Sequence, residues 1–524
     1  MPLLPLLLLP AAFVGREGAQ TPTDRVTPAY PVHSAAPGAD TLDAPAGEDL
    51  PLSGRAGLEA LTFRPLEFDP PAPETHEIAG VTVLHLYDPL LPLIDIQLQL
   101  AGGPGNFPRA RLAAVSAFPF VLRSGGTRTR TPDAVERALD ELALQLSVSG
   151  GGGALRFRMN ALRETLEPAM DLLGEILLEP GLDSLALEVW RGQTRERIRR
   201  RDDNPGSLAF SEFNRLMYGD HPVGWVLGEG DLSAERLSRS VLRRLHAVMV
   251  CRDRVLVGIS GDVTWEDAES LVRQFLDPWP QCEAPLSPLP EPAIRRGPGT
   301  FILPKAIEQS TVLLAQPSTV RQGDSGEYFA ARVADHLLGG SGFGSRIVER
   351  IRTVEGLAYG ASSVWTTPAR HEGLLGVYTA TGAETTPDAL RLLREVLEAY
   401  RRIPPSESDV RRAVEEITTG YVFAFESAAT IVARQMQFRA QGLPTDWLWR
   451  YWEGLEAVTA RSVAEVIRTH LDPDRMTVLI LGDPTRFTLG VERLGPVYEL
   501  RPDGSYRPWV TPAGPLGGVP QSPP

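Results

Sequence analysis

The chain has few side chains that could bind a metal through sulfur or imidazole. Its 524 residues include two cysteines, Cys251 and Cys282, and eight histidines. The cysteines lie too far apart for a C-x-x-C zinc site, and no two histidines are three to five residues apart. These absences exclude a disulfide framework, a cysteine zinc site and a two-histidine helical zinc motif. One disulfide between the two cysteines and two unpaired buried thiols both remain open.

Positive charge is also scarce, and almost all of it comes from arginine. Lys305 is the only lysine, and 66 acidic residues against 52 basic ones give a net charge of −14. Long basic tracts are absent, which argues against a nucleic-acid-binding surface. The 43% of hydrophobic and 23% of charged residues are typical of globular proteins, so a wholly disordered or fibrous chain is excluded.

Long apolar runs are rare as well. Residues 1–19 begin with MPLLPLLLLPAAFV, which predicts a secretory signal segment and a periplasmic or secreted protein; a mis-assigned start and a cytoplasmic protein are the alternative. No run reaches the roughly 20 apolar residues that cross a bilayer, so we expect no membrane span. The composition of residues 20–55 predicts a disordered linker, and that of residues 501–524 predicts a disordered tail.

The body of the chain is an internal duplication. The pattern that starts at Leu166 recurs at Thr386, and the pattern that starts at Asp253 recurs at Asp474, so both are offset by about 220 residues. Alternating and amphipathic runs predict interleaved strands and helices in both copies. The sequence therefore predicts an α+β fold with two homologous domains, at residues 56–283 and 299–500. Each should be a mixed, mainly antiparallel sheet covered by helices, and a proline-rich linker at residues 284–298 should join them.

Three segments resemble signatures of the pitrilysin/insulinase-type zinc peptidases, the M16 family, which includes the mitochondrial processing peptidase. They are GGTRTRTPDAVERALDELA, RIRRRDDNPGSLAFSEFNRLMYGDHPVG and LLGGSGFGSRIVERIRTVEGLAY. The resemblance implies two M16-type domains that form half of a chamber around an extended peptide. In that family an H-x-x-E-H helix binds zinc, and its glutamate serves as general base for a bound water.

The zinc motif of the resembling family is missing here. Counting back from Gly126, it falls at residues 117–121, which read AFPFV. Ala117 and Val121 then stand where the family has histidines, Phe120 stands where it has glutamate, and Arg197 stands at the third ligand. None of these side chains binds a divalent cation. We therefore expect no metal, no cofactor and no catalytic residue in this chain.

The C-terminal copy keeps other parts of the family's site. Arg352 and Tyr359 resemble a pair that holds the substrate backbone, since a guanidinium and a phenol can both donate hydrogen bonds to a peptide carbonyl. Gly339, Gly340 and Gly342 resemble a loop that contacts incoming peptide in a non-catalytic subunit. The alternatives are structural: an arginine at a helix end, a tyrosine at the core edge and a glycine-rich turn.

This combination predicts a non-catalytic, peptide-binding subunit of a heteromeric M16-type zinc peptidase. The predicted partners are a zinc-bearing homologue with an intact H-x-x-E-H motif, in a heterodimer, and an extended peptide added as a strand to a sheet edge. The zinc would belong to the partner. A structural scaffold without a peptidase role is one alternative. An independent metallopeptidase, with ligands relocated to residues such as His221 and His246, is another.

Overall fold

The computed structural model describes residues 69–341, 344–358, 360–488, 494–501 and 504–509. The residues from Pro70 onward group in one compact unit. The predicted signal segment at 1–19 and the predicted linker at 20–55 lie outside the described residues, as does most of the predicted tail at 501–524. No helix in the described ranges is long and apolar enough to cross a membrane.

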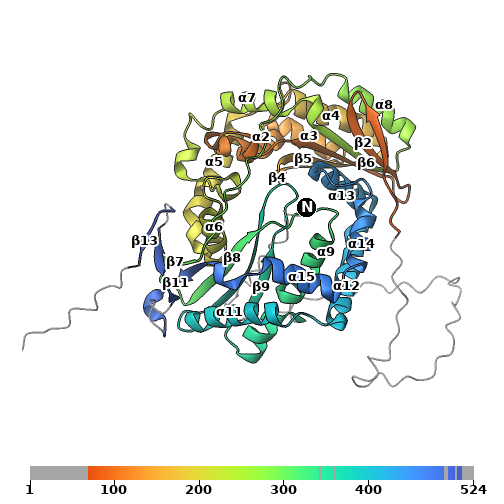
Figure 1. The fold of residues 1–524 in the computed structure, drawn as a ribbon. Coiled ribbons are helices and arrows are strands. Elements are labelled where there is room, and N and C mark those ends of the chain that lie inside the picture. The colour runs from red at the N-terminus through yellow and green to blue at the C-terminus, as the bar shows by residue number, and fades with distance from the viewer. Residues whose placement is uncertain (1–68, 342–343, 359, 489–493, 502–503, 510–524) are drawn as a thin grey trace, which may run out of the picture. The chain divides into compact units, whose positions relative to one another are not determined.

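The first half of this unit contains a six-stranded sheet (Figure 1). Its strands are β1 (Glu74–Ile78), β2 (Val81–Tyr87), β3 (Leu93–Ala101), β4 (Gln145–Gly151), β5 (Ala154–Leu162) and β6 (Val255–Gly261). They lie in the order β1-β2-β6-β3-β5-β4. β2 and β6 are parallel, and the other neighbours are antiparallel. Alternate residues of the strands enter a hydrophobic core on one face, as the two-residue period of a strand requires.

The helices of the first half supply the rest of that core. They are α2 (Leu112–Ser124), α3 (Pro132–Glu141), α4 (Leu166–Leu178), α5 (Ser184–Arg199), α6 (Pro205–Tyr218), α7 (Arg239–Met249) and α8 (Trp265–Leu276). All except α6 contribute buried residues to the core under this sheet. α3 starts as its sequence predicts, because the Thr131 side chain accepts a hydrogen bond from the Ala134 N–H and Pro132 occupies the first turn.

The second half contains a seven-stranded sheet and its own helices. The strands are β7 (Gly299–Pro304), β8 (Gln309–Ser318), β9 (Gly360–Trp365), β10 (Gly373–Gly382), β11 (Thr477–Gly482), β12 (Val497–Leu500) and β13 (Tyr506–Pro508). Their order is β13-β12-β7-β11-β8-β10-β9. The helices are α9 (Gly326–Asp335), α10 (Arg346–Val348), α11 (Thr386–Arg402), α12 (Glu407–Val422), α13 (Ala428–Gln441), α14 (Trp447–Glu456) and α15 (Ala460–His470).

The two sheets share one topology. The run β2-β6-β3-β5-β4 in the first half corresponds to β7-β11-β8-β10-β9 in the second. The directions also agree, since β7 and β11 are parallel as β2 and β6 are, and the remaining pairs of both runs are antiparallel. The predicted fold class, a duplicated α+β unit with mixed, mainly antiparallel sheets and covering helices, is confirmed.

Each half lends one helix to the sheet of the other. Leu208, Phe213 and Met217 of α6 pack in a core built from strands of the second sheet. In return, α13 lies on the first sheet (Figure 1), where the Gln97 amide donates to the Ala429 carbonyl at 2.7 Å. Gly258 permits this approach, because a Cβ there would lie 2.5 Å from a side-chain atom of Met436 and from one of Val432. The two halves are therefore interlocked by exchanged helices. These helices, α6 and α13, start at Pro205 and Ala428, 223 residues apart in the sequence.

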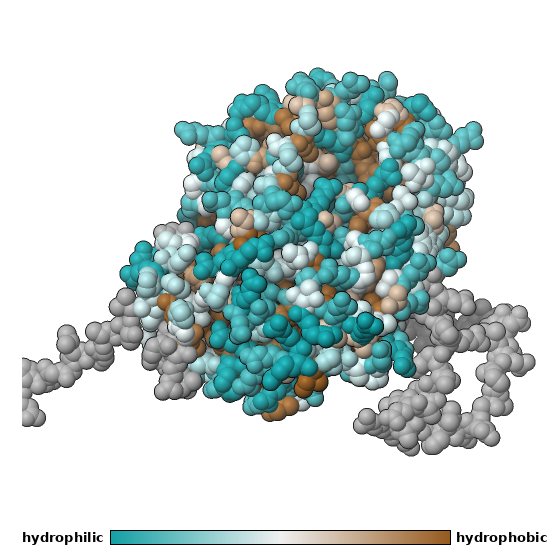
Figure 2. Space-filling model, viewed as in Figure 1, coloured by the Kyte–Doolittle hydropathy of each residue, from teal (hydrophilic) through white to brown (hydrophobic). Residues whose placement is uncertain are grey.

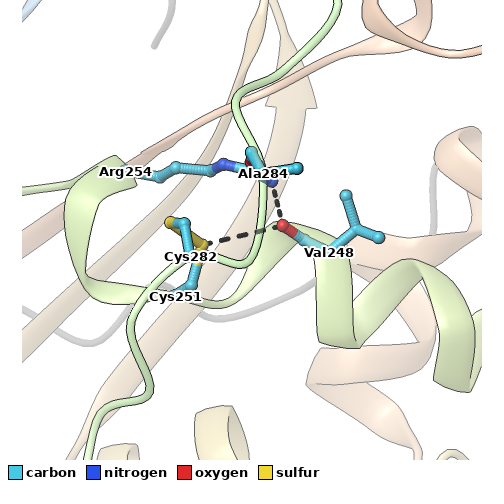
Figure 3. The surroundings of a disulfide bond; sticks show 5 residues. All are labelled: Val248, Cys251, Arg254, Cys282 and Ala284. Carbon is cyan, nitrogen blue, oxygen red and sulfur yellow. Dashed lines mark hydrogen bonds between the residues drawn. A yellow bond between two sulfur atoms is a disulfide. The ribbon is translucent and has the colours of Figure 1, made fainter.

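The segment between the halves is tied to the first half. Cys251 and Cys282 form a disulfide with Cα atoms 5.1 Å apart (Figure 3), which decides between the two states that the sequence left open. The Arg254 guanidinium donates to the Ala284 carbonyl at 2.7 Å. Further along, Asn106 donates to the Ser287 carbonyl at 2.8 Å. The proline-rich stretch thus runs along the first half with repeated polar contacts.

The surface in the view of Figure 2 is mainly hydrophilic, with hydrophobic residues scattered between polar ones. Such scattered apolar residues are normal for a water-facing surface. A few large apolar side chains are strongly exposed, among them Leu90 in the loop between β2 and β3 and Phe423 after α12.

Candidate functional site

The positions of the missing zinc motif lie inside the core of the first half. They fall on α2, and Ala117, Phe118 and Val121 are fully buried. Phe120 is partly buried and packs against the same core. Pro119 lies within the helix and close to β4, since a Cβ on Gly150 would be 2.9 Å from its ring. Apolar packing therefore occupies the place where the family has imidazoles and a carboxylate.

The position of the third metal ligand is also without a suitable group. Arg197 is exposed on α5, a helix that packs against α2, and its guanidinium donates to the Thr194 hydroxyl at 2.7 Å. The neighbouring carboxylate, Glu196, accepts a hydrogen bond from Arg200 at 2.6 Å. A guanidinium repels a divalent cation, so neither α2 nor Arg197 offers zinc a ligand.

The histidines considered for a relocated site are each bound to a backbone carbonyl. His246 Nε2 donates to the Leu177 carbonyl at 2.6 Å, and His221 Nε2 donates to the Pro290 carbonyl at 2.9 Å. Burial lowers the pKa of both imidazoles. Across the residues that the structure describes, no group of three or more His, Cys, Asp or Glu side chains is placed to hold a metal.

Arg352, the predicted substrate contact in the second half, lies in an unusual helical turn. The segment Glu349–Val354 is π-helical, and so is His336–Gly340 a few residues earlier. Single π-helical turns are rare and are frequent at functional sites. Arg352 is half-buried, whereas Ile351 beside it is fully buried. The other predicted contacts, Tyr359 and Gly342, lie outside the described residues.

The first of the predicted loop glycines has a structural explanation. A Cβ on Gly339 would come within 2.1 Å of the Ser363 backbone nitrogen on β9, so only glycine fits this contact between π-helical turn and strand. Ser362 Oγ donates to the Gly339 carbonyl at 2.9 Å. Gly340 is exposed, and its nearest neighbour would be the Asp335 carbonyl at 3.2 Å. Packing thus accounts for Gly339, and a contact with peptide stays a prediction for both glycines.

Two polar contacts that the sequence did not reveal hold the same turn in place. Ser363 Oγ donates to the Asp335 carboxylate at 2.6 Å, and burial raises the pKa of this carboxyl group. His336 Nε2 lies 2.7 Å from Glu416 Oε2 on α12. These partners are far apart in sequence and follow no motif, so only the tertiary structure could pair them.

The edge strand β4 lies beside α2 and offers backbone groups for pairing, except that its Leu146 carbonyl already accepts a hydrogen bond from the Arg123 guanidinium of α2 at 2.9 Å. β4 pairs with β5 on one side and is the last strand of its sheet among the described residues. Leu146 and Val148 point into the core, whereas Gln145, Ser147 and Ser149 are exposed. An unpaired strand edge can accept an extended peptide as a further strand.

Comparison with known proteins agrees with this geometry. The sequence model of the peptidase M16 inactive domain matches residues 236–417. A protein of Mycobacterium tuberculosis named an uncharacterized zinc protease is 25% identical over 375 residues, which is 71% of this chain and 84% of that protein. The non-peptidase homolog YmxG of Helicobacter pylori is 20% identical over 405 residues, 77% of this chain and 92% of that protein. The chain therefore resembles the M16 peptidases, most specifically over residues 236–417.

A solved structure supports the fold of this M16 homologue. The crystal structure of a peptidase M16 inactive domain from Pseudomonas fluorescens matches with a TM-score of 0.70 at 23% identity. The match covers 78% of this chain and 98% of that chain. A match that covers this much of the chain includes both halves of the duplication. The resemblance stated from the sequence is confirmed.

Proposed function

We propose that this M16 homologue is the non-catalytic, peptide-binding subunit of a heteromeric zinc peptidase. The observation that carries the proposal is the apolar filling of α2, where Ala117, Phe120 and Val121 replace the whole zinc-binding and water-activating set. Without ligands and a general base, the chain can neither hold zinc nor activate water at this site. The Helicobacter pylori relative is named a non-peptidase homolog, in agreement; the mycobacterial relative is named a zinc protease.

The retained half of the site has a role in such a complex. Arg352 would donate hydrogen bonds to the backbone carbonyl of a peptide held next to the partner's zinc, and Tyr359 would be the second donor. The exposed edge of β4, beside α2, would bind the same peptide as an added strand. The π-helical turn supports this assignment, because it displaces Arg352 from a regular helical position.

We also propose that the protein is exported from the cytoplasm. The Cys251–Cys282 disulfide is typical of proteins that fold in an oxidising compartment such as the periplasm or the cell exterior. The leucine-rich start of the chain points to the same location. The purified protein should accordingly contain no free thiol.

The proposal is tested by purifying the full chain alone and together with an H-x-x-E-H homologue from the same organism. We expect stable association, zinc in the homologue only, and peptidase activity only in the mixture. In the complex, Arg352→Ala should lower kcat by about 100-fold, as for loss of one carbonyl-polarising donor, with zinc content unchanged. Arg402→Ala, at an exposed arginine at the end of α11, is the matched control and should leave kcat unchanged.

Two outcomes would contradict the proposal. Peptidase activity with bound zinc in the lone chain would establish an independent metallopeptidase. Wild-type turnover in both Arg352→Ala and Tyr359→Phe complexes would remove the substrate role of the pair, and the structural scaffold would then be the better interpretation.

A further inference from the structure

Two arginines lie on the face of the first sheet opposite its core, on β5 beside the edge strand β4; α13 covers part of this face over β2, β6 and β3. On β5, Leu155, Phe157 and Met159 enter the core, so the intervening Arg156 and Arg158 point to the opposite face. The register places Arg158 opposite Ser147 and Arg156 opposite Ser149 on β4. Arg158 is exposed and Arg156 is half-buried.

These two positive charges have no carboxylate partner among the described residues. Arg156 Nη1 donates to the Gly151 carbonyl at 2.6 Å, which is a neutral acceptor. Burial and the neighbouring charge of Arg158 lower the pKa of the Arg156 guanidinium. The carboxylate of Asp95 on the same sheet accepts from Asn160 at 3.2 Å and forms no ion pair with either arginine. Elsewhere in the first half, arginines such as Arg163 pair with a carboxylate, here Asp262 at 3.0 Å.

The strand between the arginines and the edge carries small side chains. Ser147 and Ser149 are exposed on β4 and stand directly between the arginines and any strand added beyond them. Neighbouring strands lie about 4.8 Å apart, so an added strand would lie about 10 Å from β5. An arginine and a glutamate side chain can meet over a row of serines at this separation. Alternate residues of the added strand would point to this same face.

We propose that the strip formed by Ser147, Ser149, Arg156 and Arg158 selects extended peptides with acidic side chains at alternate positions. The inference rests on the proposed function, because it requires a peptide at the β4 edge, and it adds the chemical class of that peptide. Guanidinium groups recognise carboxylates through paired, charge-assisted hydrogen bonds. An acidic peptide would satisfy two guanidinium groups that have no carboxylate partner in the part of the chain that the structure describes.

The test uses the full chain and two labelled peptides of about ten residues, the length of a long strand. They are identical except for glutamate or glutamine at alternate positions, and binding is followed by fluorescence anisotropy. We expect the glutamate peptide to bind about threefold to tenfold more tightly at low salt, as for two partly exposed ion pairs. The preference should shrink as salt is raised, because salt screens exposed charges.

The variant with both Arg156→Gln and Arg158→Gln should lose the preference and keep its affinity for the glutamine peptide. Arg137→Gln, at an exposed arginine on α3, is the matched control and should keep the preference. Equal binding of both peptides by the wild type, or a preference that persists in the double variant, would overturn the acidic selection and leave the subunit proposal standing. Failure of both peptides to bind would contradict the two together.

Discussion

The two halves share strand order and direction but differ at equivalent places. In the first half, the helix that follows β3, α2, is apolar, and the edge strand β4 has no strand beyond it among the described residues, with Arg158 on the neighbouring strand β5. In the second half, the corresponding helix α9 ends in a half-buried carboxylate, Asp335, and the edge strand β9 is bound to it through Ser363. The duplication therefore preserves the scaffold, whereas the chemistry on the equivalent helix and edge has diverged.

The largest expected effect concerns the exchanged helices. Phe213 of α6 is buried against the second sheet, so Phe213→Ala should lower the free energy of unfolding by about 3–5 kcal/mol. Hydrogen exchange should rise mainly in β7, β8 and β11, although the residue belongs to the first half. Met436→Ala on α13 is the reciprocal variant, and it should raise exchange in β2 and β6. Faster exchange confined to the mutated half would show that the halves are not interlocked in this way.

A smaller effect separates the two predicted loop glycines. Gly339→Ala forces a Cβ against the backbone of β9 and should cost about 1–3 kcal/mol, as overpacking does. A Cβ on Gly340 would have more space, so Gly340→Ala should lower the free energy of unfolding clearly less. Chemical denaturation of both variants provides the measurement. Equal stability of the two, with weaker peptide binding in Gly339→Ala, would instead support a direct role of this glycine in the site.

The smallest expected difference is in the response to acid. Burial lowers the folded-state pKa of His246 and His221, both in the first half, while the unfolded chain keeps a value near 6.5. The unfolded state then binds more protons, so their stabilising contribution is present above about pH 6.5 and is lost as the pH falls through the folded pKa. Thermal unfolding should begin at a lower temperature at pH 5.5 than at pH 7.5.

His246→Gln tests this assignment, because an amide can still donate to the Leu177 carbonyl but does not titrate in this range. In this variant the difference in unfolding temperature between pH 5.5 and pH 7.5 should be smaller. The difference that remains should come from His221. An unchanged difference between the two pH values in His246→Gln would remove His246 as its source.

Much of the fold could be predicted because it repeats. The offset between the copies and the alternation within strands gave the duplicated α+β unit, and Thr131 with Pro132 gave the start of α3. The alternation of Arg156 and Arg158 with core residues was also visible in the sequence. The sequence did not show which strand lies beside them. Only the strand register places both arginines opposite the serines of the edge strand β4.

Other features left no local signal. The apolar face of α6 shows that the helix is buried, but it does not say against which sheet. The disulfide required that Cys251 and Cys282 approach each other in space. Gly339 is indistinguishable in sequence from its neighbours, and only the position of β9 decides that it cannot carry a side chain.

By itself, the sequence determined the repeated unit, the resemblance to the M16 peptidases and the lack of zinc ligands at residues 117–121, since these depend on residue types and on spacing along the chain. The tertiary structure alone decided which helix covers which sheet, that the two cysteines are joined and that Arg156 and Arg158 have no ion pair with a carboxylate among the described residues. These depend on distances between residues far apart in sequence, which packing of the whole chain sets and which no local pattern encodes.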